Sequence, residues 1–234
     1  MAPRADGRLP RAIEMDSRRL TRLLDAAHLA PTNERQEHGF IFQSAASALL
    51  GLTTPPSYID PDDGFVRDEE SGASVPVSFK NIRHHRPVEL GSLAHSVERR
   101  EGFRMYVAFW TGGRGDGLAI DHIHVMSMPP GYFRSLFPRD VEPFLAPAVF
   151  RGITNDRADD IRWRHRLAEL REQWREALPP ESPIRVRFKR DHGTQRRVQC
   201  AITPVGFDAM FELTYDETHT RELEELLDGG AMRT

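Results

Sequence analysis

The segment from Val75 to Lys80 constrains the fold of this chain more than any other. Apolar side chains recur at every second position along Val75-Pro76-Val77-Ser78-Phe79-Lys80, and a period of two residues is typical of a β-strand with one buried face. The alternation predicts that Val77 and Phe79 face a hydrophobic core. Ser78 and Lys80 then share the opposite face.

An acidic turn precedes this strand. Three aspartates surround a proline in Asp60-Pro61-Asp62-Asp63-Gly64, about fifteen residues before the strand ends its alternation. Turn residues followed by an alternating run predict a β-hairpin. We expect Lys80 to face whatever the aspartates face, which is the arrangement of a two-strand acidic site that holds a metal ion.

Lysine is rare in this chain, and its rarity adds interest to Lys80. Only Lys80 and Lys189 are lysines among 32 basic residues; the rest are arginines. An ammonium group is a compact charge whose pKa shifts readily, whereas a guanidinium group stays charged. A functional role for Lys80 follows as a hypothesis, beside the simpler interpretation that this lysine reaches into solvent.

The hairpin resembles the PD-(D/E)xK nucleases, and within them the type II restriction endonucleases. The resemblance rests on Pro61-Asp62, then fifteen residues, then Ser78-Phe79-Lys80. In that family two acids hold Mg²⁺, and the lysine orients or activates the attacking water. The resemblance therefore implies that Asp62 or Asp63 binds Mg²⁺ with help from the Phe79 carbonyl.

This chain departs from the family pattern at two positions. Ser78 stands where an acid is usual, so a second carboxylate has to come from elsewhere, and the candidates are Asp63, Glu70 and Glu89. The run Gly39-Phe40-Ile41-Phe42-Gln43 resembles the first helix of many of these nucleases, in which an acid joins the metal site. Gln43 takes that place and can orient a water but supplies no charge. An exposed polar position on an amphipathic helix explains Gln43 equally well.

Length and composition exclude several classes of protein. The chain has 234 residues, a single cysteine and a formal net charge of −3. The length suits one well-buried domain, which we expect over 1–234 with a loose N-terminus at 1–14. One cysteine excludes an internal disulfide and a cysteine-based zinc cluster. Without an apolar run of membrane-spanning length or a signal-peptide pattern, we expect a cytoplasmic protein with no membrane association.

The order of predicted elements favours an α/β fold with a mixed central sheet flanked by helices, like that of restriction endonucleases. Periodicity and capping residues predict helices at 16–30, 36–50, 89–98, 132–137 and 160–178, and a surface helix at 217–228. Buried strands are predicted at 105–110 and 118–126. Glu89 at the start of its helix has a structural explanation too, because a carboxylate there is favourable for the helix dipole.

A basic hairpin is predicted at 184–203. Between residues 181 and 200 six basic residues stand against two acidic ones, although the whole chain is slightly acidic. A two-stranded ribbon fits the DNA major groove, where arginine pairs with guanine and glutamine with adenine. We expect contacts to double-stranded DNA from Lys189, Arg190, His192, Arg196, Arg197 and Gln199. An ordinary solvated sheet face is the alternative.

Two histidine-containing segments offer further candidates. Arg83, His84 and His85 follow Lys80 closely and would suit phosphate contacts, although a solvated loop has the same composition. The run Asp121-His122-Ile123-His124 has some likeness to the Asp-His cluster of HNH nucleases. That site needs an asparagine and a histidine on a following helix, and the nearest are Asn155 and His165. Polar residues on alternate strand positions explain the run more simply.

The sequence thus favours a Mg²⁺-dependent, sequence-specific endonuclease of a restriction system that hydrolyses phosphodiester bonds in double-stranded DNA. Symmetric cleavage of a palindromic site would imply a homodimer. The first alternative is a non-catalytic DNA-binding protein derived from a nuclease fold, which the neutral Gln43 and Ser78 support. The second is an interaction protein without a nucleic-acid role, which the net negative charge supports.

Overall fold

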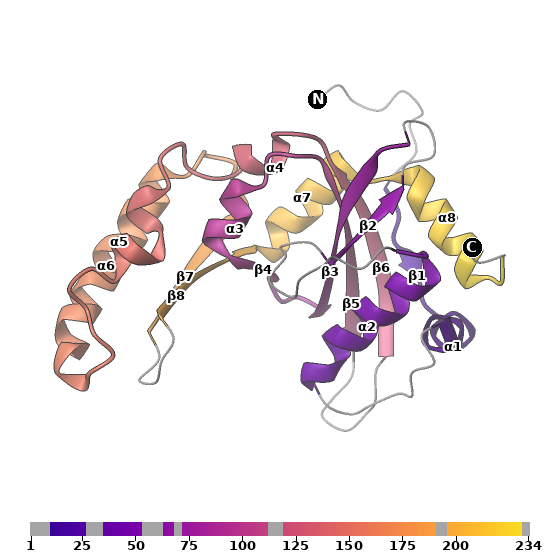
Figure 1. Cartoon of the computed structure of the whole chain (residues 1–234), viewed down its shortest axis with the longest axis horizontal. Coiled ribbons are helices and arrows are strands. Elements are labelled where there is room, and N and C mark those ends of the chain that lie inside the picture. Colours follow the sequence, from indigo (N-terminus) through magenta and orange to yellow (C-terminus); the bar gives the residue numbers. More distant parts are fainter. Residues whose placement is uncertain are drawn as a thin grey trace. The chain divides into compact units, whose positions relative to one another are not determined.

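The chain forms two compact units (Figure 1). The computed structural model describes residues 10–26, 35–52, 63–67, 72–111, 119–190 and 196–230, with side chains of the second helix from Ile41 onward. Within these ranges, the first unit joins the residues up to Arg86 with Gly102–Pro129 and the residues from Asp208 onward. Pro87–Glu101 and Pro130–Phe207 form the second unit. The single domain expected from the sequence over 1–234 stays a prediction.

The first unit is built on a mixed sheet of five strands in the order β1-β6-β5-β3-β2. Strand β3 pairs antiparallel with β2 on one side and parallel with β5 on the other, and β6 pairs antiparallel with both β5 and β1. The expectation of an α/β fold with a mixed sheet flanked by helices is confirmed. The bounds are β1 Ile13–Glu14, β2 Gly64–Arg67, β3 Ser74–Arg83, β5 Phe103–Thr111 and β6 Ala119–Met128.

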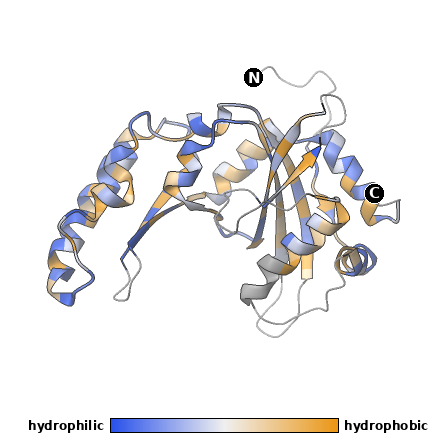
Figure 2. Cartoon of the chain, in the orientation of Figure 1, coloured by the Kyte–Doolittle hydropathy of each residue, from blue (hydrophilic) through white to orange (hydrophobic). Residues whose placement is uncertain are grey.

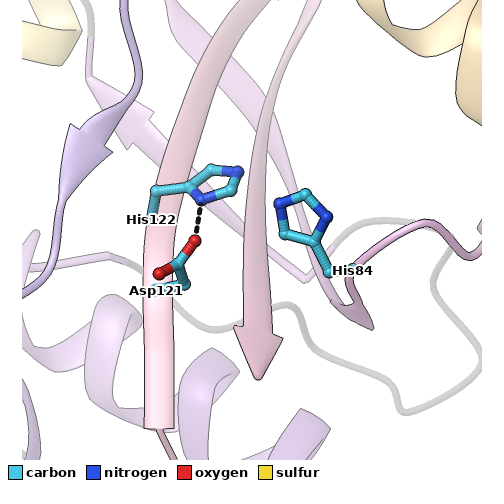
Figure 3. A group of neighbouring side chains, drawn as sticks. All are labelled: His84, Asp121 and His122. Atoms are coloured by element: carbon cyan, nitrogen blue, oxygen red, sulfur yellow. Dashed lines mark hydrogen bonds and ion pairs between the residues drawn. The ribbon is translucent and has the colours of Figure 1, made fainter. Parts of the chain in front are cut away.

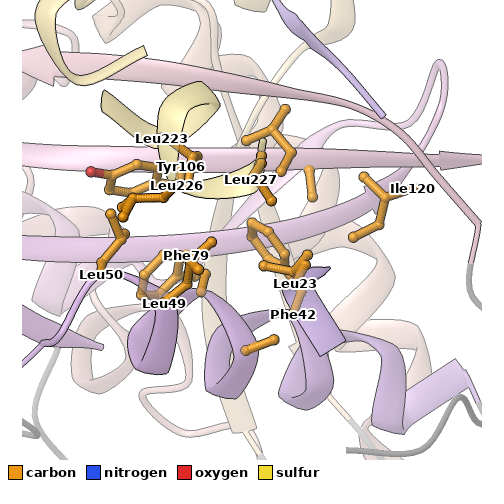
Figure 4. Close-up of a cluster of buried hydrophobic side chains, with 14 of the residues drawn as sticks. Leu23, Phe42, Leu49, Leu50, Phe79, Tyr106, Ile120, Leu223, Leu226 and Leu227 are labelled. Carbon is orange, nitrogen blue, oxygen red and sulfur yellow. The ribbon is translucent and has the colours of Figure 1, made fainter. Parts of the chain in front are cut away.

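Helices α1 Ser17–Ala26, α2 Arg35–Leu49 and α8 Glu217–Leu227 pack with this sheet in one hydrophobic cluster (Figure 4). Asp16 caps α1 as expected, because its carboxylate accepts a hydrogen bond from the Arg19 N–H at 2.8 Å. Phe79 contacts Phe42 edge-on and stacks on Tyr106, with ring centroids 5.7 and 5.3 Å apart. The predicted stripe on α2, Phe42, Ala45, Ala46, Leu49 and Leu50, is buried in this core.

The alternation predicted for β3 is confirmed. Val77 and Phe79 belong to the hydrophobic cluster with α1, α2 and α8, whereas Ser78 and Lys80 do not. In Figure 2 the strands of this sheet carry much of the hydrophobic colour, while α1 and α8 carry both colours. Helix α8 is amphipathic: Thr220, Leu223, Leu226 and Leu227 are buried, whereas Arg221 and Glu225 are exposed.

A buried ionic network joins α8 to β5. Asp216 caps α8 through the His219 N–H, and its carboxylate lies 3.5 Å from the Arg104 guanidinium and 2.8 Å from the His219 ring. Burial raises the pKa of Asp216, but the hydrogen bonds from His219 and the charges of His219 and Arg104 outweigh it, and the net pKa lies below its ordinary value. Burial also raises the pKa of Tyr106 to about 12.

The second unit holds a three-stranded antiparallel sheet in the order β4-β8-β7. Its helices carry an aromatic core in which Phe144 packs edge-on against Trp174 and Phe150 stacks on Trp163. Helix α7 Pro204–Thr214 starts in this unit and ends in the first. The remaining bounds are β4 Val88–Ser92, α3 Leu93–Glu98, α4 Tyr132–Ser135, η1 Glu142–Phe144, α5 Ala146–Val149, η2 Arg157–Asp159, α6 Asp160–Ala177, β7 Ile184–Arg190 and β8 Arg196–Ile202.

One local expectation is wrong. The helix predicted at 89–98 begins only at Leu93, because Val88–Ser92 pairs with β8 as a strand that is interrupted by a bulge between Glu89 and Gly91. Gly91 itself takes a φ of +87°, which favours glycine. Near the N-terminus, Ile13 is fully buried and pairs with Ile123. In the parts of the chain that the structure describes, every helix is too short or too polar to cross a membrane.

Candidate active site

The hairpin of β2 and β3 brings Asp63 and Lys80 together. Asp63 directly precedes β2, and its N–H donates to the Val77 carbonyl at 2.8 Å, which fixes the residue opposite the middle of β3. Its carboxylate oxygen Oδ2 accepts a hydrogen bond from the Phe79 N–H at 2.6 Å and lies 3.4 Å from the Ser78 hydroxyl. The Lys80 Nζ lies 3.7 Å from the same oxygen.

The pair lies at an intermediate depth. The side chains of Asp63 and Lys80 are both 22% exposed, while Ser78 is only 2% exposed. Partial burial strengthens the attraction between the two charges relative to water, yet leaves the carboxylate reachable from solvent. Because an ionised carboxylate has about four acceptor positions on two oxygens, its contacts with β3 are compatible with a cation beside it.

A hard cation such as Mg²⁺ binds through carboxylate oxygens and keeps several waters, so one or two carboxylates suffice. Asp63 is one such ligand. Asp62, Glu70 and His192 lie outside the described residues. Within the residues that are described, Asp63 belongs to no group of three carboxylate, imidazole or thiol side chains close enough to share an ion. The source of a second carboxylate thus stays a prediction.

Two further residues that the sequence offered for the metal site, Glu89 and Gln43, have other neighbours in the structure. Glu89 lies on β4 of the second unit, where its carboxylate pairs with the Arg187 guanidinium at 2.9 Å. The expectation that it begins a helix is wrong, and it serves the charge balance of the three-stranded sheet. Gln43 lies half-buried on α2, next to the core residue Phe42.

A second cluster of polar side chains forms where β3 and β6 come near each other across β5. The ring of His84, directly after β3, and the ring of His122, on β6, have centroids 5.2 Å apart. The Asp121 carboxylate lies 2.7 Å from His122 Nδ1, within hydrogen-bond distance. Figure 3 shows the two imidazoles directed toward each other with the carboxylate beside His122.

A β-bulge places Asp121 and His122 in the same cluster. Phe109 pairs with His122, but the next residue, Trp110, pairs with Ile120, so Asp121 is the extra residue of β6. Neighbouring residues of a regular strand point to opposite faces, and a bulge turns one side chain out of that pattern. The bulged backbone is held in place, since the Asp121 carbonyl accepts a hydrogen bond from the Met15 N–H at 2.9 Å.

A pocket of about 680 Å³ opens beside this cluster and is lined by Arg83, His84, His85, Arg86, Trp110, Thr111 and Asp121. A turn forms part of its wall; in this turn the Arg86 N–H donates to the Arg83 carbonyl at 3.1 Å and His85 takes a left-handed φ of +59°. The Arg83 guanidinium lies 5.9 Å from the Trp110 ring centroid. The structure therefore brings Arg83, His84 and His85 into one pocket.

His124 differs from the other two histidines of this sheet. Its ring packs edge-on against Phe211, with centroids 4.2 Å apart, and against Phe109 at 5.2 Å. Burial, with smaller contributions from the charges of His122 and His84, lowers the pKa of His124 to about 3. The side chain is therefore neutral near pH 7. The other residues of the HNH alternative, Asn155 and His165, belong to the second unit.

The predicted basic hairpin forms as β7 and β8. Arg187 pairs with Gln199 and Lys189 with Arg197, while Ile184, Phe188, Val198 and Cys200 are buried on the other side. We call the outward side the basic face; its residues are Arg185, Arg187, Lys189, Arg197 and Gln199. Burial, with a smaller contribution from the charge of Arg187, lowers the pKa of Arg185.

Arg190 and Arg196 are bound within the protein. The Arg190 side chain is 1% exposed and contacts the Asp160 carboxylate at 2.7 Å and the Asp156 carbonyl at 2.6 Å. Arg196 donates to the Ile153 carbonyl at 2.7 Å. Sequence alternation could not separate these two arginines from those of the basic face, because the loop before η2 and the first turn of α6 lie far from the hairpin in sequence.

The cluster of His84, Asp121 and His122 was the main feature that the sequence did not indicate as a unit. Asp121 and His122 stood out only beside His124, whereas their partner is His84. The signal depends on the parallel pairing of β3 with β5 and on the bulge in β6, which a single sequence does not reveal. Comparison with protein-family models, with curated proteins and with solved structures found no match for this chain.

Proposed function

We propose that this protein is a Mg²⁺-dependent endonuclease that hydrolyses double-stranded DNA, on a fold related to that of the restriction endonucleases. The observation that carries the proposal is the contact between Asp63 and Lys80, 3.7 Å apart on the hairpin of β2 and β3. We assign to Asp63, which the sequence left as an alternative to Asp62, the role of a metal ligand, and to Lys80 that of the group that assists the attacking water. Ser78, between them in the motif, is buried and hydrogen-bonded to the acid.

The donor set fits Mg²⁺. Asp63 provides a half-buried carboxylate, its neighbour Asp62 is a second acid in sequence, and the Phe79 carbonyl is the third expected ligand. Mg²⁺ in this position would polarise the phosphate and lower the pKa of a bound water. No imidazole is needed in such a set, which distinguishes it from the cluster around His122.

The roles of the protein groups follow from their positions. Hydrolysis joins a water oxygen to phosphorus and breaks one ester bond, while the water loses a proton and the leaving sugar oxygen gains one. The Lys80 ammonium group, held by Asp63, can donate to the attacking water and stabilise the negative charge that grows on the phosphate. The Phe79 N–H keeps the Asp63 carboxylate oriented through its hydrogen bond of 2.6 Å.

Binding to DNA is assigned to two groups of cations. The basic face of β7 and β8 presents three arginines and a lysine with Gln199, which suits phosphate contacts and base reading in the major groove. Arg83, Arg86 and His85 line the pocket of the first unit and suit phosphate contacts. Arg187 pairs with Glu89, but its side chain is 46% exposed and stays in the assignment. We leave out Arg190, whose side chain is 1% exposed, and Arg196, which donates to the Ile153 carbonyl. A homodimer would serve symmetric cleavage.

A non-catalytic DNA-binding protein is the second candidate. It is favoured by Ser78, which stands at the position of the second acid of the family motif. Both candidates require binding of duplex DNA that weakens steeply with salt. An interaction protein without a nucleic-acid role requires no such binding.

The test is incubation of the purified protein with plasmid and phage DNA of mixed sequence, with Mg²⁺ or with EDTA. We expect discrete fragments with Mg²⁺ only, and none from Lys80→Ala or from an Asp62→Ala/Asp63→Ala double variant. Arg171→Ala is the control, since it removes an exposed cation of α6 that belongs to neither proposed group of DNA contacts and leaves the hairpin of β2 and β3 intact. Absence of cutting while DNA still shifts in a gel would establish the binding protein instead.

A further inference from the structure

We propose that His84, Asp121 and His122 bind a divalent transition-metal ion such as Zn²⁺, at a site separate from that of Asp63. One ligand atom from each of the three side chains lies within 4.8 Å of those of the other two. Two imidazoles and a carboxylate are a frequent protein donor set for Zn²⁺ with an open coordination position. All three residues belong to the first unit.

The required rearrangement is small. With metal–ligand bonds of about 2.1 Å, the ligand atoms of a tetrahedral site lie about 3.4 Å apart. His122 Nδ1 and the Asp121 carboxylate lie 2.7 Å apart in a hydrogen bond, so on metal binding they would separate by about 0.7 Å and release the proton between them to solvent. The backbone N–H of His84 is held by the Trp110 carbonyl at 3.2 Å, so its side chain, whose ligand atom lies within 4.8 Å of the other two, would have to rotate toward them.

The backbone around the cluster holds the ligands in place. The bulge in β6 directs Asp121 to the side of His122, and bulges of this kind occur often beside functional sites. The ring of Phe109 stacks on His122 at 5.0 Å and limits its rotation. His85, next to His84, adopts a φ of +59°, a conformation that is costly for most residues other than glycine. The turn thus keeps His84 over the sheet at a cost in backbone energy.

Access and charge make the proposed site selective among metal ions. The pocket of about 680 Å³ reaches His84 and Asp121 and provides an entry path from solvent. Arg83 and Arg86 line the same pocket and repel a cation by charge. Binding must therefore come from the covalent character of imidazole ligation, which Zn²⁺ and Co²⁺ have and Mg²⁺ lacks. We expect a site that Mg²⁺ does not fill.

The experiment is a titration of the full-length protein, free of purification tags and dialysed against EDTA and then buffer, with Co²⁺ alone. Visible d–d absorption reports Co²⁺ bound by nitrogen ligands, and Zn²⁺ should displace it. We expect one Co²⁺ per chain, removed by one equivalent of Zn²⁺ but retained in about a hundredfold excess of Mg²⁺. Affinity should fall about a hundredfold in His84→Gln and in His122→Ala, and about tenfold in Asp121→Asn.

Controls separate this site from the proposed nuclease and from loss of folding. His165→Ala, an exposed histidine of α6, should leave Co²⁺ affinity unchanged, and circular dichroism should show folded variants. Asp63→Asn and Lys80→Ala should keep full Co²⁺ binding even where they abolish cleavage, so either proposal can fail alone. The metal site is refuted if folded His84→Gln and His122→Ala bind Co²⁺ as tightly as the unchanged protein, or if the loss follows Asp63→Asn instead.

Discussion

Lys80 and Lys189, the two lysines of the chain, lie in contrasting surroundings. Lys80 is on a strand of the five-stranded sheet, with its ammonium group 3.7 Å from the Asp63 carboxylate. Lys189 is on a strand of the three-stranded sheet, opposite Arg197 and among other cations. A cation beside a half-buried acid can take part in chemistry at a metal site, whereas a cation among cations adds to a positive surface. The contrast separates the proposed catalysis from the proposed binding of DNA.

The largest expected effect is the loss of cleavage when Lys80 is replaced. Lys80→Ala should lower the rate of Mg²⁺-dependent cleavage by about a thousandfold or more, because it removes a charge that stabilises the transition state. Binding of duplex DNA should change less than about threefold, since the Lys80 ammonium group is paired with Asp63 and lies outside the proposed DNA contacts. Cleavage rates at saturating protein and gel-shift titrations measure the two quantities. Equal losses of cleavage and binding would contradict the separation.

The second prediction concerns the opposite face of the same strand. Phe79→Ala should lower the free energy of unfolding by about 3–5 kcal/mol, because the ring is buried between Phe42 and Tyr106. Denaturant unfolding of this variant and of Lys80→Ala makes the comparison. Lys80→Ala should change stability by about 1 kcal/mol or less. A large loss of stability in Lys80→Ala would indicate that this lysine is structural.

The third prediction uses pH to examine the buried acid of the five-stranded unit. The folded pKa of Asp216 is depressed, so the unfolded state takes up a proton first as pH falls, and the stabilisation is lost below the ordinary pKa of about 3.9. At higher pH the stabilisation is fully present. Asp216→Asn should cost about 1–3 kcal/mol at neutral pH and flatten the acid side of the stability curve. Unfolding measured from pH 7 to pH 3 checks both; a parallel curve for the variant would assign the acid sensitivity elsewhere.

The smallest effects are expected on the basic face. Arg187→Ala and Arg197→Ala should each weaken binding of duplex DNA by about tenfold at low salt and reduce the salt slope by about one. Arg190→Ala should leave that slope unchanged, because its guanidinium group binds Asp160 and the Asp156 carbonyl. Cleavage at saturating protein should persist in all three variants. A salt slope that Arg190→Ala lowers as much as Arg197→Ala would place the DNA on the other side of the hairpin.

Periodicity predicted the elements in which neighbouring side chains alternate regularly. Strand β3 and the hairpin of β7 and β8 follow a period of two, and α2 and α6 follow the helical period. Strand β5 was predicted from its continuous apolar run instead, and it is buried on both faces. An acid beside Lys80 was predictable too, because the two strands of a hairpin are close in sequence. Glu89 was assigned to a helix because nothing in its neighbours signals a strand with a bulge between Glu89 and Gly91. The role of His84 depends on the pairing of strands distant in sequence.

The single extra residue in β6 has a consequence for how the histidine cluster can evolve. Residues on both sides of Asp121 keep regular partners on β5, from Ile120 with Trp110 to His122 with Phe109. Deletion of that one codon would restore an uninterrupted ladder and leave every core side chain on its own face, while it removes the carboxylate and the carbonyl that accepts from Met15. Insertion of one codon would create it again. Relatives with and without the residue should therefore share the same sheet but differ in whether they carry the third ligand.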